Sequence, residues 1–208
     1  MNPLKLFFAP RHTVRDAYEN PNLPLAFALV ILPVIFSAGV ALFFGISFEL
    51  IALAFDALRD IIVWVFGGIV LYILLYVLKG KEIKGKIAGV LSAFSLLYVI
   101  QLVMLAALIT GLMLAAPGLM SKVAELQKTA AQMDAGSILS ELSSVQTAPE
   151  GALFMAIGIT FAALGVLFLF AVYFFYSLAA EGGKSGRARN ILVMVIFFGF
   201  LMLINSIL

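Results

Sequence analysis

Five apolar stretches without a charged residue dominate the chain, and each is long enough to cross a lipid bilayer. A helix rises 1.5 Å per residue, so about 20 residues cover the ~30 Å hydrocarbon core. The stretches are residues 23–46, 61–78, 87–114, 153–180 and 191–208. Because 64% of the residues are hydrophobic and only 12% are charged, the chain has too few charges to cover a soluble globule. We therefore predict an all-α integral membrane protein, a five-transmembrane-helix bundle with short interfacial amphipathic helices.

The distribution of positive charge predicts the orientation of this bundle. Lysine and arginine residues next to membrane spans are retained on the cytoplasmic side. Ten of the 13 lysines and arginines lie before the first stretch or in the connections after the second and fourth stretches. The other side of the membrane holds Arg59, Lys122 and Lys128. We predict a multi-pass protein of the cell membrane with a cytoplasmic N-terminus and an exterior C-terminus.

Residues 1–22 are expected to form a cytoplasmic N-terminal segment ahead of a membrane domain at residues 23–208. Within this segment, residues 10–20 have the pattern of a short amphipathic helix, with Thr13 as the expected N-cap and Asp16 three residues later. We expect this helix to lie on the inner leaflet. A frayed linker next to the membrane is the alternative.

A polar insert at residues 116–151 separates the third and fourth stretches on the exterior side. Apolar residues recur in it at helical spacing, and Ser137 is a candidate N-cap for a second helix. We expect two short amphipathic helices against the outer face. They would cover a substrate path, pack on the bundle, or form a contact between two copies of the chain.

Residues 48–60 carry charges that share one helix face. Glu49 and Asp56 are seven residues apart, and Asp56 precedes Arg59 and Asp60 by three and four. Carboxylates within a membrane are candidates for binding a cation or carrying protons. The structural interpretation, which we favour, is an amphipathic helix on the outer surface or the exposed first turns of a long second span, in which Arg59 pairs with Asp56.

Within the expected spans, small residues recur at spacings that allow close helix packing. They are Gly85 with Gly89, Ala107 with Gly111, and Gly158 with Gly165. Pro33 is expected to bend the first span because it removes a backbone donor. Gln101 is the one large amide near the centre of a span, and we expect it to form a hydrogen bond between helices.

The residues needed for most enzymatic chemistry are missing. The chain has no cysteine and one histidine, which excludes disulfides, thiolate nucleophiles and thiolate metal sites. The stretch EGGKSGRARN resembles the end of a phosphate-binding loop but lacks the first glycine of that motif. We expect no enzymatic activity, no cofactor and no metal. Nucleic-acid binding is not expected either, because the net charge of +2 is spread over several loops.

Three sequence segments carry a family resemblance. They are the proline-punctuated LFFAPRHTVRDAYENPNLP before the first span, the turn LKGKEIKGK between the second and third spans, and LSAFSLLYVIQL after it. Together they resemble the prokaryotic branch of the Yip family, the Ypt/Rab-interacting membrane proteins. The eukaryotic branch has Asp-Leu-Tyr-Gly-Pro before its first span, where this chain has Leu6 to Pro10 and keeps only an aromatic residue and the proline. The resemblance implies a cytoplasmic N-terminus, no enzymatic chemistry and a role in membrane traffic or organisation.

We therefore expect a non-enzymatic scaffold or organiser of membrane partners, with a small transporter or permease subunit as the alternative. The expected partners are membrane lipids and membrane or cytoplasmic proteins, and a homo-oligomer is left open. In the first hypothesis, lipids or partners bind to cytoplasmic cations: Arg11, Arg15, Lys79, Lys81, Lys84, Lys86, Lys184, Arg187 and Arg189. In the second hypothesis, Glu49 and Asp56 are the ion-linked residues.

Overall fold

The computed structural model describes residues 2–80, 83–129, 135–145, 147–182 and 186–207, and within these ranges all regular structure is helical. Five helical segments in the described ranges are long and apolar enough to cross a membrane. They are α2 (Leu23–Phe43), α3 (Leu50–Lys79), α4 with α5 (Ile87–Phe94 and Leu96–Ala115), α8 (Glu150–Glu181) and α9 (Arg187–Ile207). The prediction of an all-helical chain with five such segments is confirmed.

Most of the helices begin or end a few residues away from the ends of the charge-free stretches, and two segments differ more clearly. The helix α3 begins at Leu50 and is continuous through Asp56, Arg59 and Asp60, although its charge-free part starts at Ile61. The third segment is divided at Ser95, whose hydroxyl donates a hydrogen bond to the Ser92 carbonyl oxygen over 2.8 Å. The sequence prediction marked each stretch by the absence of charged residues. A charged side chain disfavours burial in lipid but does not end a helix, and this explains why α3 begins before its charge-free part.

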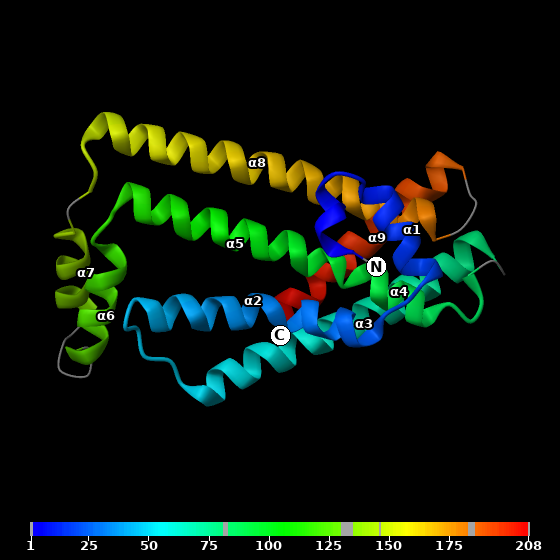
Figure 1. Cartoon of the computed structure of the whole chain (residues 1–208), viewed down its shortest axis with the longest axis horizontal. Helices are drawn as coiled ribbons and strands as arrows, with labels where there is room; N and C mark the ends of the chain where they lie inside the picture. Colours follow the sequence, from blue (N-terminus) through cyan, green and yellow to red (C-terminus); the bar gives the residue numbers. More distant parts are fainter. Residues whose placement is uncertain (1, 81–82, 130–134, 146, 183–185, 208) are drawn as a thin grey trace.

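The long helices lie side by side along the long axis of the molecule, and short elements gather at its two ends (Figure 1). At one end lie η1 (Pro3–Phe7), α1 (Pro10–Glu19) and the connections α3–α4 and α8–α9. We call this the basic end. At the other end, α6 (Leu119–Thr129) and α7 (Ala135–Ser143) lie across the ends of α5 and α8, and we call it the hairpin end.

The buried core lies towards the basic end and is rich in phenylalanine. Phe94, Phe174 and Phe197 are almost completely buried. Phe94 meets Phe197 edge-to-face with ring centroids 5.3 Å apart, and Phe175 meets Phe197 at 6.0 Å. Towards the hairpin end, by contrast, α8 leaves large apolar side chains such as Phe154 and Phe161 exposed, as expected for a surface that faces lipid.

The N-terminal segment packs against the helices of the bundle, and several of its side chains are buried there. Leu6, Val14 and Ala17 are completely buried, and α1 contacts both α4 and α8. The predicted helix is confirmed, but the predicted N-cap is wrong. The helix begins at Pro10, which is well suited to the first helical turn, and the Thr13 hydroxyl donates a hydrogen bond to the Ala9 carbonyl oxygen from within the helix.

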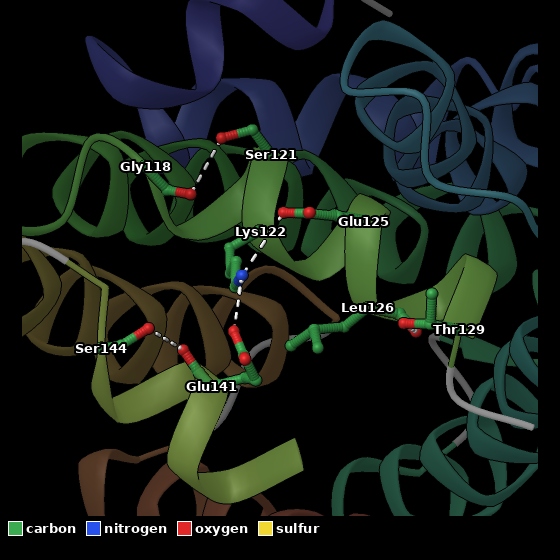
Figure 2. A network of polar contacts seen from close by, with 8 residues as sticks. All are labelled: Gly118, Ser121, Lys122, Glu125, Leu126, Thr129, Glu141 and Ser144. Carbon is green, nitrogen blue, oxygen red and sulfur yellow. Dashed lines mark hydrogen bonds and ion pairs between the residues drawn. The ribbon is translucent and has the colours of Figure 1, made fainter. Parts of the chain in front are cut away.

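The hairpin end is held by a small polar network, shown in Figure 2. The Lys122 ammonium on α6 lies 2.7 Å from a Glu141 carboxylate oxygen on α7 and 3.4 Å from Glu125. A second anchor joins α6 to the α2–α3 loop, since the Gln127 amide accepts from the Ser47 N–H and donates to the Ser47 carbonyl oxygen. Two short exterior helices were predicted here, but Ser137 lies inside α7 and is not its N-cap.

The predicted small-residue contacts are partly wrong. Gly89 packs closely, but against α1, and Gly111 lies against the Thr160 side chain on α8. Gly85 has a φ of +77° and forms the turn before α4, where a side chain would be strained. At Gly158 and Gly165, an added Cβ atom would meet no other atom within 4 Å, so these glycines do not bring helices of this chain together.

Candidate functional sites

Two of the predicted basic residues are held by one carboxylate at the basic end. An Arg11 guanidinium nitrogen and Arg15 Nε each lie 2.8 Å from different oxygens of Glu181, at the end of α8. The Glu181 side chain is only 6% exposed, whereas the two arginine side chains are more than half exposed. The hydrogen bond from Arg15 to Glu181 raises the pKa of Arg15 further above its ordinary value. This arrangement links α1 to α8 and neutralises part of the charge of both arginines.

A buried tyrosine supports the same contact between α1 and α8. The Tyr18 hydroxyl donates a hydrogen bond to the Leu178 carbonyl oxygen over 3.0 Å. Burial raises the pKa of the Tyr18 phenol above its ordinary range, so Tyr18 remains a neutral donor. On the exposed side of α1, a hydrogen bond from the Asn20 amide lowers the pKa of Asp16.

Four other predicted cations at the basic end have exposed side chains. Two of them, Lys84 and Lys86, lie in the α3–α4 connection, and Arg187 and Arg189 lie in the first turn of α9. Figure 1 places both connections at the same end of the molecule. Lys79 ends α3, but its side chain is not described, and Lys81 and Lys184 lie outside the described residues. We call the four exposed residues the cationic surface.

A second candidate site is a polar cavity of about 250 Å³ between α2, α3 and α5. Its lining residues are Pro33, Val34, Ser37, Leu53, Asp56, Arg59, Asp60, Gln101 and Leu105. The cavity therefore reaches Pro33, which is near the middle of α2, and Asp56, whose side chain is exposed, is among the residues that line it. A hydrogen bond from the Tyr98 hydroxyl to the Asp60 carbonyl oxygen, 2.8 Å long, fixes this register of α3 against α5.

The position of these carboxylates corrects part of the sequence interpretation. Of the two structural interpretations, the separate helix on the outer surface is wrong, because residues 50–60 are the first turns of α3. Glu49 is exposed at the N-cap of α3 and is not among the residues lining the cavity that contains Asp56. Asp60 and Gln101 do line it. The four-residue spacing of Asp56 and Asp60 indicated that both carboxylates lie on one face of a helix. The spacing did not indicate that α2 and α5 form the other walls of the cavity.

Next to the polar cavity lies an apolar groove of about 830 Å³ between α5, α8 and α9. Residues 97–108 of α5 form one wall, Leu164, Ala171 and Phe175 of α8 a second, and residues 198–206 of α9 a third. Gln101 and Leu105 line both spaces, so the groove and the polar cavity adjoin across one face of α5. We call the two together the hollow.

The described residues thus define an all-helical chain with five segments able to cross a membrane, a cationic surface at one end and a hollow beside α5. No group of three or more His, Asp or Glu side chains in the described ranges is placed to hold a metal ion. Comparison of the chain with protein-family models, with curated proteins and with solved structures finds no match in any of the three.

Proposed function

We propose that this chain is a non-enzymatic protein of the cell membrane that gathers anionic lipids and membrane partners at its basic end. The N-terminus is cytoplasmic and the C-terminus exterior in this proposal, in keeping with the resemblance to the Yip family. The supporting observation is the cationic surface, in which Lys84, Lys86, Arg187 and Arg189 are exposed at the same end of the molecule.

Electrostatic attraction explains why the cationic surface would gather anionic lipids. Each lysine or arginine close to an anionic membrane surface contributes about 1 kcal/mol of attraction, so four exposed cations act strongly together. Arg11 and Arg15 contribute less because Glu181 already pairs with both. The cationic surface therefore depends mainly on the α3–α4 and α8–α9 connections.

The experiment measures which lipids the full chain retains in nanodiscs made from equal parts of phosphatidylglycerol and phosphatidylcholine. We expect enrichment of phosphatidylglycerol around the wild-type protein. The combined variant Lys84→Gln, Lys86→Gln, Arg187→Gln and Arg189→Gln should lose most of this enrichment. A control that removes cations from the other end, Lys122→Gln with Lys128→Gln, should keep it. Equal enrichment in all three proteins would contradict the proposal.

A small transporter is the second candidate, and the polar cavity favours it. Asp56 and Asp60 line a space level with the middle of α2, a position where carboxylates serve proton or ion movement in many membrane proteins. Proton flux into liposomes containing the full chain, followed with a pH-sensitive dye, tests this function. Transport predicts a flux that Asp56→Asn abolishes and Glu49→Gln preserves. Flux no greater than in empty liposomes rejects it.

A further inference from the structure

The hollow consists of an apolar groove and an adjoining cavity that is lined by carboxylates. The groove wall is apolar except for Gln101 and Ser206. The adjoining cavity presents two carboxylates, Asp56 and Asp60, and of the described residues that line it Arg59 is the only cation. Its lining therefore carries a net negative charge beside a large apolar wall.

We propose that the hollow binds one membrane lipid with an amine-bearing headgroup. The acyl chains lie in the groove along α5 and α8, and the ammonium group lies at Asp56 and Asp60. This site is separate from the cationic surface, and its occupancy does not depend on the function proposed for that surface.

The residues that line the hollow favour a ligand with one apolar part and one polar part. A wholly polar solute would leave the groove beside Met104, Leu108 and Leu164 without an apolar partner. A wholly apolar molecule would leave the net negative charge of the cavity uncompensated in a membrane, which is energetically costly. A volume of about 830 Å³ lies within the range of ligand sites of roughly 300–1,000 Å³.

The charge of the cavity selects the headgroup. An ammonium group pairs with a carboxylate and supplies up to three hydrogen-bond donors, whereas a headgroup such as phosphatidylglycerol brings its phosphate without a cation and would add to the negative charge. Charge also argues against a second copy of this chain as the occupant. In a two-fold symmetric contact with its axis at the cavity, Asp56 and Asp60 of one copy would face the same residues of the other.

The test uses a phosphatidylethanolamine that carries a photoactivatable diazirine in one acyl chain, at low abundance in phosphatidylcholine nanodiscs containing the full chain. Phosphatidylglycerol with the same acyl chain is the comparison probe. After illumination, mass spectrometry locates the labelled residues. We expect phosphatidylethanolamine to label residues 97–108 and 198–206 several-fold more than the exposed residues Phe161 and Val166 of α8.

Two kinds of variant separate the two parts of the proposal. Leu164→Trp fills the groove and should reduce labelling several-fold, and Leu108→Trp is a second variant that fills it from α5. Val166→Trp, on the same helix but outside the lining, is the matched control and should leave labelling unchanged. Asp56→Asn with Asp60→Asn should remove the preference for phosphatidylethanolamine over phosphatidylglycerol, and Glu49→Gln should keep it.

Three outcomes would overturn the proposal. The first is labelling spread evenly over the exposed apolar faces, or labelling unaffected by both tryptophan variants. The second is equal labelling by the two lipids in the wild-type protein. The third is crosslinking of one chain to another through residues 97–108, which would identify the groove as an interface between copies.

Discussion

Gly89 on α4 lies directly beneath the backbone of Tyr18 on α1, so that a Cβ atom at position 89 would come within 2.5 Å of the Tyr18 carbonyl oxygen. The contact involves backbone on both sides and therefore has no flexible side chain that can move aside. It joins the N-terminal segment to α4, and the hydroxyl of the same tyrosine donates a hydrogen bond to the Leu178 carbonyl oxygen on α8. The position of α1 thus depends on a glycine far from it in sequence.

Gly89→Ala is expected to destabilise the protein by about 1–3 kcal/mol, the usual cost of adding a methyl group to a closely packed site. The cost arises because α1 must move away from α4 to make room. Thermal unfolding in detergent measures the stability, and hydrogen exchange of residues 10–19 reports the displacement of α1.

The matched control is Gly165→Ala, since no atom lies within 4 Å of the Cβ position there. It should be neutral or stabilising by up to about 1 kcal/mol, because alanine has the higher helix propensity. Equal stabilities of the two variants would show that α1 does not pack against Gly89.

Glu181→Gln is expected to loosen α1 from the end of α8. Glutamine keeps one acceptor oxygen but removes the charge that pairs with both Arg11 and Arg15, and charge-assisted hydrogen bonds are about twice as strong as neutral ones. Trypsin cuts after arginine only where the chain is unfolded locally. Cleavage after Arg11 and Arg15 should therefore become several-fold faster than in Glu150→Gln, a variant at the opposite end of α8. The same rate in both variants would exclude a role for Glu181 in holding α1.

The long helices were predictable from the sequence, because the apolar composition of a segment indicates the medium that surrounds it. A run such as residues 153–180 is apolar enough to favour a lipid medium, in which a single segment is expected to be helical, and this is why five long apolar helices were predicted and found. The amphipathic pattern of residues 10–20 likewise predicted a helix, and α1 occupies almost the same range.

The candidate sites were less predictable because they depend on contacts between distant segments. Nothing in the local sequence of Glu181 indicates that its carboxylate accepts from Arg11 and Arg15. That Asp60 and Gln101 line the same cavity likewise depends on the register of α3 against α5, which the Tyr98 hydroxyl fixes. Charge patterns identified Arg11, Arg15 and Asp56, and only the packed structure identified their neighbours.

Tyr18→Phe is expected to lower the stability by about 0.5–1.5 kcal/mol, the usual contribution of one hydrogen bond. The loss stays within this range because the Leu178 carbonyl oxygen also accepts from the Gly182 N–H and is not left without a donor. Thermal unfolding near neutral pH measures the difference. Tyr76→Phe, which alters a tyrosine that is 41% exposed, is the control and should have little effect.

The raised pKa of Tyr18 adds a pH dependence with a defined sign. Its folded-state pKa lies above the ordinary value of 10.0, so the stabilisation from the neutral phenol is complete below pH 10 and is lost as the pH rises above that value. The stability difference between the wild-type protein and Tyr18→Phe should therefore shrink between neutral pH and about pH 11. A constant difference over this interval would mean that Tyr18 titrates alike in the folded and unfolded chain.

The orientation proposed for the chain can be tested without removing any native thiol, because the sequence contains no cysteine. Lys84→Cys places a thiol at the basic end, and Lys128→Cys places one on α6 at the hairpin end, with the α4–α5 segment between them. A membrane-impermeant maleimide should label Lys128→Cys in intact cells and Lys84→Cys only after the membrane is permeabilised. The reverse pattern would invert the orientation and place the cationic surface outside the cell. Labelling of both thiols in intact cells would contradict a crossing by residues 87–115, and the five-pass arrangement would then be wrong.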